Sequence, residues 1–422
     1  MSSMKEKFSI PALMFEFKKL KLLKAFIRGK VNPRGYWKSG GPVSLKNVPY
    51  PRLIAEDWVI VKTVFCGICG SDMTELKLSG SLDNPIRSFI SFPQIMGHEP
   101  VGIIESVGNK VKKFKKGDRV VISPWFSCVP RGILPICSRC SLGDYKHCQN
   151  FQKGNLPVGM HLGVTSGYGG FSPYLSVHES QCFLIPENIS FEQAVLADPF
   201  SVSFHSLILL NPNPDSQILV YGLGIIGLLT IHCLKNIFRV KHIIGIGRYK
   251  FQKDLAIKLG ADHVFLNSSN LLIEEVATYN NDELYTPKKG LKWTLDGVNG
   301  ILDTIASAES FEIGERILCT QGKLVFLGVS TPKRFENTLH YFKELEVIGS
   351  NGFSIETFQG KSLHAFQHYL YFLSEGLIDP QFLITHKFPL EQYQKAFNTL
   401  SDKRNSHAVK VVFNFNSEFN LK

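Results

Sequence analysis

The stretch Ile218–Leu229, ILVYGLGIIGLL, decides the fold of this chain. Gly222, Gly224 and Gly227 have the spacing G-x-G-x-x-G and stand between an apolar strand and an apolar helix. The first glycine permits a tight turn, the second lets the backbone approach a pyrophosphate, and the third lets the helix pack close to the strand. The positive helix N-terminus then favours phosphate. The pattern predicts a dinucleotide-binding turn.

Strands and helices alternate downstream of about Phe200, which indicates a doubly wound parallel sheet. The predicted strands are Ile218–Tyr221, His242–Ile246, Lys323–Leu327 and Glu346–Gly349, and the predicted helices are Ile225–Leu234 and Phe251–Leu259.

The second of these strands bears on the choice of cofactor. An NAD site usually has Asp or Glu about twenty residues after the glycines, but here Gly247 takes that position and Arg248 and Lys250 follow. Arg248 can hold a 2′-phosphate through charge-assisted hydrogen bonds, so we expect NADP(H) in preference to NAD(H). The alternative is that Arg248 stacks on adenine without discriminating. The predicted cofactor-binding residues are Gly222, Gly224, Ile225, Ile226, Gly227, Gly247, Arg248, Lys250 and Gly328.

The region from Pro42 to about Phe183 consists of short β-rich runs broken by Gly and Pro. It predicts a β-rich domain with long loops. Predicted strands here are Trp58–Val64, Gly102–Val107 and Arg119–Ser123, and the tail adds a helix near Leu363–Glu375 and a strand near Val409–Phe413.

The N-terminal region predicts a strand at Ala12–Phe17 and a basic amphipathic helix at Lys18–Lys30. We interpret the helix as packed on its own domain with its lysines in solvent. The alternative is a helix that lies on a membrane surface.

The composition narrows the class of protein. Lys and Arg total 47 against 36 Asp and Glu, a net charge of +11, without a nucleic-acid recognition motif. No apolar run is long enough to cross a membrane. The N-terminus lacks a signal-peptide core, so we expect a cytoplasmic protein whose nine cysteines are reduced. Metal binding is then a better interpretation of the cysteines than disulfides.

Four cysteines lie close together in sequence, at Cys128, Cys137, Cys140 and Cys148. Four thiolates satisfy a tetrahedral Zn²⁺ without an open position, which predicts a structural site. Disulfides or free thiols are the alternatives.

A second set of candidate ligands lies in FCGICGSD (Phe65–Asp72) and MGHE (Met96–Glu99). Cys69 and His98 are a plausible pair of ligands for a catalytic zinc. Cys66-x-x-Cys69 alone could be a redox pair, but the later Gly-His-Glu makes that interpretation weaker.

Taken together and in order, these motifs resemble the zinc-containing medium-chain dehydrogenase/reductase superfamily, in the branch of sorbitol and threonine dehydrogenases. The further matching segments are GHEPVGIIESVG (97–108), KKGDRVV (115–121), GYGGFSPYLSV (167–177), ADPFSVSFH (197–205), LGAD (259–262) and QGKLVFLG (321–328). The resemblance implies a β-rich, GroES-like catalytic domain built from both chain ends and a Rossmann domain between them, with the active site in a cleft. We expect the catalytic domain at 1–198, the NADP-binding domain at 199–350 and the return to the catalytic domain at 351–422.

The resemblance also implies roles for single residues. Cys69 and His98 ligate a catalytic zinc, and Asp198 falls where family members carry Cys, Glu or Asp as third ligand. Glu99 is the residue that some polyol dehydrogenases use instead, so it either ligates or exchanges with water. Asp72 orients the His98 ring. A helix N-cap is the alternative role for Asp198.

The chain departs from the family pattern at three places. Leu134 stands where members often have a cysteine of the structural loop, so Cys128 must reach in from farther back. Thr74 stands where classical alcohol dehydrogenases of the family often have His, so their terminal proton shuttle is absent or different here. We expect Ser71, one residue from Asp72, to accept the hydroxyl proton, and the expected catalytic residues are Ser71, Asp72 and Thr74. The helix at Lys18–Lys30 lengthens the usual N-terminal region.

We therefore expect an alcohol dehydrogenase that transfers hydride between an alcohol or polyol, or its carbonyl, and NADP(H), with Zn²⁺ in a catalytic and a structural site. The alternatives are a zinc-independent quinone or enone reductase and a non-catalytic dinucleotide-binding protein of the same fold. The expected partner is a small-molecule alcohol or carbonyl, without nucleic acid or a transmembrane segment, in a homodimer or homotetramer.

Overall fold

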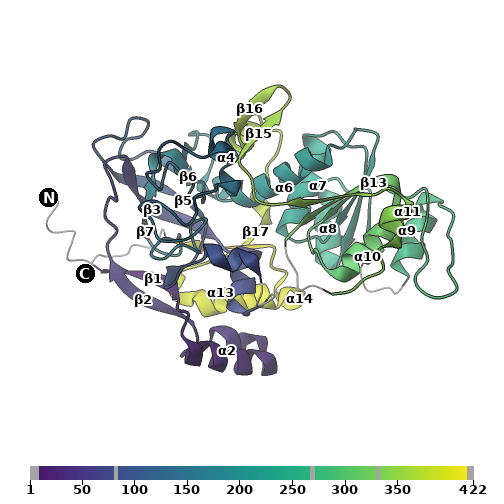
Figure 1. The fold of residues 1–422 in the computed structure, drawn as a ribbon, viewed down its shortest axis with the longest axis horizontal. Coiled ribbons are helices and arrows are strands. Elements are labelled where there is room, and N and C mark those ends of the chain that lie inside the picture. Colours follow the sequence, from purple (N-terminus) through teal and green to yellow (C-terminus); the bar gives the residue numbers. More distant parts are fainter. Residues whose placement is uncertain (1–8, 80–83, 267–270, 329–332, 416–422) are drawn as a thin grey trace. The chain divides into compact units, whose positions relative to one another are not determined.

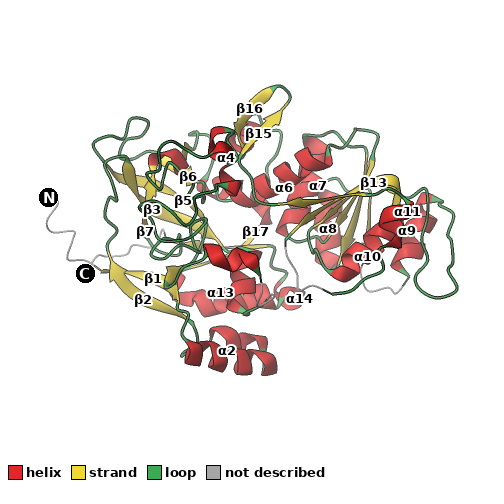
Figure 2. Ribbon diagram, in the orientation of Figure 1, coloured by secondary structure: helices red, strands yellow, loops and turns green. Residues whose placement is uncertain are grey.

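The computed structural model describes residues 9–79, 84–266, 271–328 and 333–415. Contacts divide the chain into two compact units. Unit 1 comprises Met1–Asp198, Phe366–Glu375 and Gln381–Lys422, and unit 2 comprises Pro199–Ala365 and Gly376–Pro380. Figure 1 follows the chain through both units, and Figure 2 distinguishes their helices from their strands. Unit 1 therefore draws on both ends of the chain.

Unit 1 is β-rich, as its short runs broken by Gly and Pro predict. The main sheet of the described residues has the order β17-β18-β3-β5-β6-β8, and β7 also pairs with β3. The strands are β3 Trp58–Gly67, β5 Glu99–Val107, β6 Arg119–Ile122, β7 Tyr174–His178, β8 Cys182–Leu184, β17 Ile384–Phe388 and β18 Lys410–Asn414. Strand β18 comes from the C-terminal part of the chain and pairs antiparallel with β3, with Phe413 opposite Cys66. This pairing joins the two ends of the chain in one sheet.

A smaller sheet in unit 1 has the order β2-β1-β4. Its strands are β1 Ser9–Phe15, β2 Val43–Pro49 and β4 Gln94–Ile95. The helix α2, Lys19–Val31, lies between β1 and β2 in the chain, and a 3₁₀ turn at Pro33–Trp37 follows it. The predicted N-terminal strand and helix are confirmed, with bounds that differ by one to three residues. The other helices with residues in unit 1 are α3 Gly70–Leu76, α4 Ser138–Ser141, α5 Phe191–Ala194, α12 Ala365–Ser374, α13 Tyr393–Ser401 and α14 Lys403–Ser406.

Unit 2 contains a parallel sheet of order β11-β10-β9-β12-β13-β14, which confirms the predicted α/β alternation. The strands are β9 Gln217–Tyr221, β10 His242–Gly247, β11 His263–Leu266, β12 Val298–Asp303, β13 Leu318–Leu327 and β14 Glu346–Ser350. The helices are α6 Ala197–Leu210, which begins in unit 1, α7 Ile225–Asn236, α8 Lys250–Lys258, α9 Leu272–Asn280, α10 Ala308–Ile317 and α11 Thr338–Phe342. The order reverses at β9, so the carboxyl end of β9 is the topological switch point where doubly wound sheets bind dinucleotides.

A hairpin of β15, Ile355–Phe358, and β16, Lys361–His364, lies at the end of the first segment of unit 2, Pro199–Ala365. Phe358 lies 5.4 Å from Phe204 and 5.1 Å from Phe238, measured between ring centroids. These aromatic contacts keep residues 351–365 in unit 2, whereas the sequence-based boundary sets the return of the chain at 351.

None of the described helices combines the length and the apolar character that crossing a bilayer requires.

Candidate metal centres and dinucleotide-binding turn

The first candidate centre lies where β3 ends and α3 begins. Cys69 is the extended residue that precedes α3, and its backbone N–H donates to Asp72 Oδ2 at 2.8 Å. Asp72 is buried in the first turn of α3 and therefore fixes the corner that carries the Cys69 sulfur. Gly67, just before the corner, lets the Glu99 carboxylate lie close to the backbone of β3, because a Cβ at this position would collide with that carboxylate.

The second part of this centre comes from the start of β5. Gly97 has a φ of +89°, and a Cβ at this position would overlap the ring of Phe171. The turn delivers His98 and Glu99, both buried, beside Cys69. One ligand atom from each of the three residues lies within 4.8 Å of the other two. Sulfur, imidazole and carboxylate together form a donor set that suits Zn²⁺.

Asp198, the expected third ligand, is buried in the first turn of α6 but lies outside that three-residue group. Burial and then the charge of Glu99 raise the pKa of Asp198 to about 7. The Asp198 carboxyl therefore interacts electrostatically with Glu99, but it is not one of the three residues whose ligand atoms lie within 4.8 Å of one another.

The expected catalytic residues lie on α3. Ser71 and Thr74 are exposed, and the Thr74 hydroxyl donates to the Gly70 carbonyl at 3.0 Å within the helix. Asp72 Oδ1 lies 3.7 Å from His98 Nδ1, an ion-pair distance longer than a hydrogen bond. The Asp72 carboxylate therefore contacts the Cys69 backbone directly and the His98 ring electrostatically.

Two residues beside the centre escaped the sequence interpretation. Lys410 is buried on β18, forms an ion pair with Glu99, and donates to the Ile68 carbonyl at 3.2 Å. The signal for Lys410 was a single lysine within an apolar strand. The ring of His161 lies 5.2 Å from that of His98, and burial, followed by the charge of His98, lowers the pKa of His161 to about 3. No motif marks His161.

Charge balance supports a cation at this centre. The carboxyls of Asp72, Glu99 and Asp198 and the sulfur of Cys69 all interact electrostatically with the buried ammonium of Lys410. Burying several anionic groups together is costly unless a cation neutralises them. The donor set therefore fits a divalent ion.

The second candidate centre consists of the four predicted cysteines. The sulfurs of Cys128, Cys137, Cys140 and Cys148 all lie within 4.8 Å of one another, and none of the nine cysteines is in a disulfide. The Sγ atoms of Cys128 and Cys148 are 3.6 Å apart. A tetrahedron with Zn–S bonds of about 2.3 Å has edges of about 3.8 Å, so the spacing fits zinc. Cys128 does reach in from farther back in the chain.

N–H groups donate to the cluster sulfurs, but only Cys137 has a lowered pKa, whereas burial first raises the pKa of Cys128 despite its N–H donors. The backbone N–H of Cys137 donates to Cys128 Sγ at 3.3 Å, and Asn150 Nδ2 donates to the same sulfur at 3.2 Å. Burial opposes ionisation of Cys137, but N–H donors from Gln149 and Cys140 outweigh it and lower the pKa of Cys137 to about 6. Thiolate is the form that binds metal.

In unit 2, the glycine turn has the geometry that its spacing predicts. Gly222 follows β9 with a φ of +97°, Gly224 is open to its surroundings, and a Cβ at Gly227 would overlap the Gly222 carbonyl. Ile225 and Ile226 begin α7, so the helix N-terminus points its free N–H groups into the turn.

The remaining predicted cofactor-binding residues lie at or just after the ends of the neighbouring strands β10 and β13. Gly247 ends β10 and is buried against Leu223, whereas Arg248 is exposed and its guanidinium lies 5.8 Å from the Tyr249 ring centroid. Lys250 pairs with Asp254 at 2.9 Å. Gly328 follows β13 with a φ of +114°. The parallel sheet thus gathers all these residues at the carboxyl ends of its strands.

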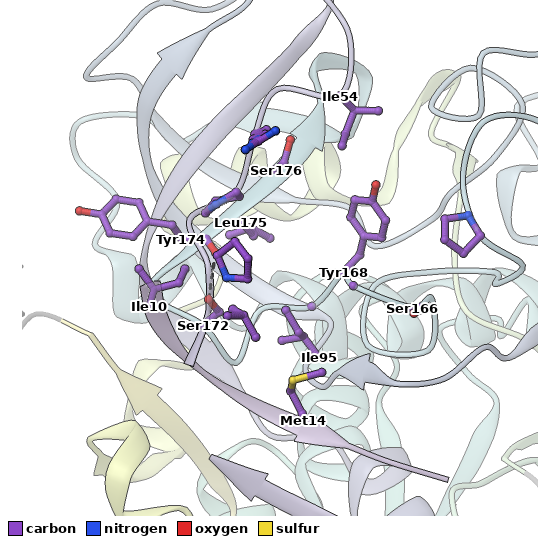
Figure 3. A pocket seen from close by; sticks show the side chains of 17 residues that line it. Ile10, Met14, Ile54, Ile95, Ser166, Tyr168, Ser172, Tyr174, Leu175 and Ser176 are labelled. Carbon is purple, nitrogen blue, oxygen red and sulfur yellow. Dashed lines mark hydrogen bonds between the residues drawn. The ribbon is translucent and has the colours of Figure 1, made fainter. Parts of the chain in front are cut away.

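A separate hollow of about 430 Å³ lies in unit 1 beside β1, β2 and β7 (Figure 3). Its mainly apolar lining includes Ile10, Ile95, Tyr168 and Leu175. The lining residues include none of the eight candidate zinc ligands, so this hollow is distinct from both centres.

Comparisons with known proteins identify the family of the chain. Residues 55–187 match the family model "Alcohol dehydrogenase GroES-like domain", and residues 226–367 match "Zinc-binding dehydrogenase". The chain is 30% identical to sorbitol dehydrogenase of Arabidopsis thaliana over 361 residues, which cover 84% of this chain and 88% of the relative. It is 29% identical to (R,R)-butanediol dehydrogenase of Saccharomyces cerevisiae over 408 residues, which cover 92% and 99%.

Among solved structures, the chain resembles an alcohol dehydrogenase, rspB, of Escherichia coli CFT073 complexed with NADH. The TM-score is 0.73 at 25% identity, and the match covers 97% of this chain and 100% of the other.

Proposed function

Since the chain belongs to the zinc-containing medium-chain dehydrogenase/reductase superfamily and is an oxidoreductase of alcohols or polyols, we propose that it is a zinc-dependent alcohol dehydrogenase that prefers NADP(H). The observation that carries the proposal is the convergence of Cys69, His98 and Glu99 within 4.8 Å at a buried corner. The same convergence argues against a zinc-independent reductase, which has no use for this set of ligands.

In the proposed mechanism, Zn²⁺ supplies a Lewis acid for the substrate's C–O group and the nicotinamide supplies the hydride acceptor or donor. Cys69, His98 and a carboxylate hold the metal. Asp72 holds the Cys69 backbone through its 2.8 Å hydrogen bond and keeps a negative charge near the His98 ring. Ser71, exposed two residues after Cys69, accepts the substrate's hydroxyl proton and passes it towards solvent.

We propose Asp198 as the third metal ligand, with Glu99 either ligating or exchanging with water. The buried ion pair with Lys410 supports a secondary role for Glu99, because its carboxylate already has a cationic partner. Under this assignment, Asp198→Asn lowers zinc content at the catalytic site more than Glu99→Gln does. The reverse order of zinc loss, measured on folded protein, would assign the ligand to Glu99.

The second cluster, Cys128, Cys137, Cys140 and Cys148, holds a structural zinc in this proposal, because four sulfurs leave no open position for substrate. The preference for NADP(H) rests on the exposed Arg248 and on Gly247 in place of an acidic residue. We further propose assembly as a homodimer or homotetramer in the cytoplasm.

The test combines metal analysis with a panel of secondary alcohols, polyols and their carbonyls, assayed with NADP(H) and NAD(H) by nicotinamide absorbance. We expect two zinc ions per chain, and Cys69→Ser abolishes turnover while NADP(H) still binds. Cys319→Ser, a half-buried cysteine on β13 outside both clusters, is the matched control and keeps its activity. Near-normal turnover of Cys69→Ser would remove zinc from the chemistry.

A further inference from the structure

The helix α2 packs on unit 1 through a narrow face of small residues. Its buried residues are Ala25 and Gly29, and half-buried Leu22 packs against the core. A Cβ at Gly29 would collide with the Tyr36 ring. The 3₁₀ turn that carries Tyr36 is itself fixed, because the Trp37 indole donates to Asn398 Oδ1 of α13 at 2.9 Å. The rotation of α2 about its own axis is therefore defined.

With this rotation, an apolar stripe points away from the protein. Leu20, Leu23, Ile27 and Val31 are 75%, 56%, 57% and 87% exposed. At 3.6 residues per turn they fall within an arc of about 80°, nearly opposite the buried face. Figure 1 shows α2 at the lower edge of the view, without another labelled element below it. The helix α2 therefore packs on its own domain, as predicted, but a second apolar face of the helix stays exposed.

Basic side chains flank the stripe on both sides. By the same helical geometry, Lys24 and Arg28 lie along one edge and Lys19 and Lys30 along the other, and all four are exposed. The segment 18–30 contains six Lys and Arg residues and no acidic residue. Outside the helix, Glu16 accepts from Lys21 at 2.5 Å and Lys46 at 2.8 Å, which ties the start of α2 to β2.

We propose that α2 is a docking helix for an anionic lipid surface, into which the stripe Leu20, Leu23, Ile27 and Val31 inserts while the flanking cations meet acidic headgroups. A helix of 13 residues is about 20 Å long and cannot cross a hydrocarbon core of about 30 Å, but it can lie in the interface. The inference is independent of the proposed catalytic activity.

Charge complementarity selects this occupant over a second copy of the chain. A symmetric dimer through the stripe would bring the cations on both edges of one α2 against the same cations of the other, and such like-charge contacts are unfavourable. An anionic bilayer offers negative charge along both edges and an apolar layer beneath the stripe.

The experiment is flotation of the full-length protein with phosphatidylcholine vesicles that contain or lack phosphatidylserine. We expect binding that requires phosphatidylserine and weakens as salt rises. Leu23→Gln/Ile27→Gln reduces binding by about tenfold or more, because both side chains leave the apolar layer. Ile257→Gln, an exposed residue on α8, is the apolar control and binds as the wild type does.

The cationic edges are tested in the same way. Lys19→Gln/Lys24→Gln weakens binding, whereas Lys112→Gln/Lys113→Gln removes the same charge from an exposed loop and has a smaller effect. All four positions are exposed, so folding, checked by circular dichroism, is unchanged.

Three results would overturn the proposal. The first is equal binding to both kinds of vesicle. The second is unchanged binding of Leu23→Gln/Ile27→Gln, which would mean adsorption of a basic protein without insertion. The third is a wild-type protein that binds neither kind of vesicle, together with a change in oligomeric state of Leu23→Gln/Ile27→Gln on size exclusion. This result would assign the stripe to a contact with a second copy of the chain. A blue shift of tryptophan emission in Leu23→Trp on addition of acidic vesicles would support insertion, and an unshifted spectrum would contradict it.

Discussion

The buried guanidinium of Arg131 closes the loop that carries the four clustered cysteines. Its Nε donates to the Phe126 carbonyl at 2.9 Å, before Cys128 in the chain. Its Nη atoms donate to four carbonyls that follow Cys148, those of Lys153, Leu156, Pro157 and Gly159. The side chain is fully buried. All five N–H donors of arginine are therefore used, and both ends of the cysteine loop meet at one cation.

Arg131→Lys is a sharp test, because it keeps the positive charge and reduces the donors from five to three. At least two buried carbonyls lose their partners, and each costs about 1–3 kcal/mol. The free energy of unfolding should fall by about 2–6 kcal/mol. At about 2–4 °C per kcal/mol for a unit of this size, the melting midpoint should drop by about 4 °C or more.

The assay is thermal unfolding followed by circular dichroism, together with zinc release to a chromogenic chelator. Zinc should leave Arg131→Lys faster, because its ligands sit on a loop whose ends are no longer clamped. Arg139→Lys is the control within the same loop: Arg139 is half exposed and lies 3.6 Å from Asp144, so its loss should cost less than about 0.5 kcal/mol. Equal melting midpoints and equal rates of zinc release for the two variants would refute the role of Arg131 in holding the two ends of the cysteine loop together.

The other predictions concern the cluster of four cysteines, the choice of cofactor, and the ion pairs of Glu16 at the start of α2. Cys137→Ser should lower the melting midpoint and remove one zinc per chain, whereas Cys319→Ser should keep both; an unchanged midpoint would count against a structural zinc. Arg248→Asp should reduce kcat/KM for NADP⁺ relative to NAD⁺ by about tenfold or more, since at least one charge-assisted bond of about 1.5–3 kcal/mol is lost; an equal loss with both cofactors would indicate stacking on adenine. Hydrogen bonds, first from Lys21, lower the pKa of Glu16 from 4.5 to about 2, so its contribution is complete above pH 4.5 and disappears as the pH falls towards 2. Glu16→Gln should therefore lower the unfolding free energy by about 1–2 kcal/mol at neutral pH, and a difference that stays constant in acid would contradict this origin.

Sequence was most informative where the determinants of structure are local. The turn at Gly222 and Gly227 needs a positive φ and a close helix approach, and only glycine meets both requirements, so six residues specify it. The cysteine loop is similar, because four ligands within about twenty residues can converge without help from distant strands. The parallel sheet followed from the alternation of apolar strands and helices.

Sequence was less informative where two faces of one element compete for burial. In α2, apolar residues point in several directions, and periodicity alone does not say which face packs inward. The face that packs inward is the one where the absence of a side chain at Gly29 lets the Tyr36 ring lie close to the helix. The larger apolar residues lie on the outer face, and the contact with Tyr36 that defines the inner face is not encoded by any pattern within the helix.

The charge balance of the catalytic corner is the least local feature, and it bears directly on the metal ligand. Lys410 reaches Glu99 only because β18 pairs with β3 and β3 pairs with β5, across more than three hundred residues of chain. Glu99 must therefore divide its carboxylate between a buried ammonium and a metal, and moving towards the metal leaves that ammonium without its partner, at a cost that grows in a low-dielectric interior. Asp198 is buried without belonging to the tight group, and its pKa is raised to about 7 by burial first and then by the charge of Glu99. A cation bound by Asp198 relieves the repulsion between the Asp198 and Glu99 carboxylates and leaves the Glu99–Lys410 ion pair intact. A cation bound by Glu99 also relieves that repulsion, but it breaks the ion pair with Lys410.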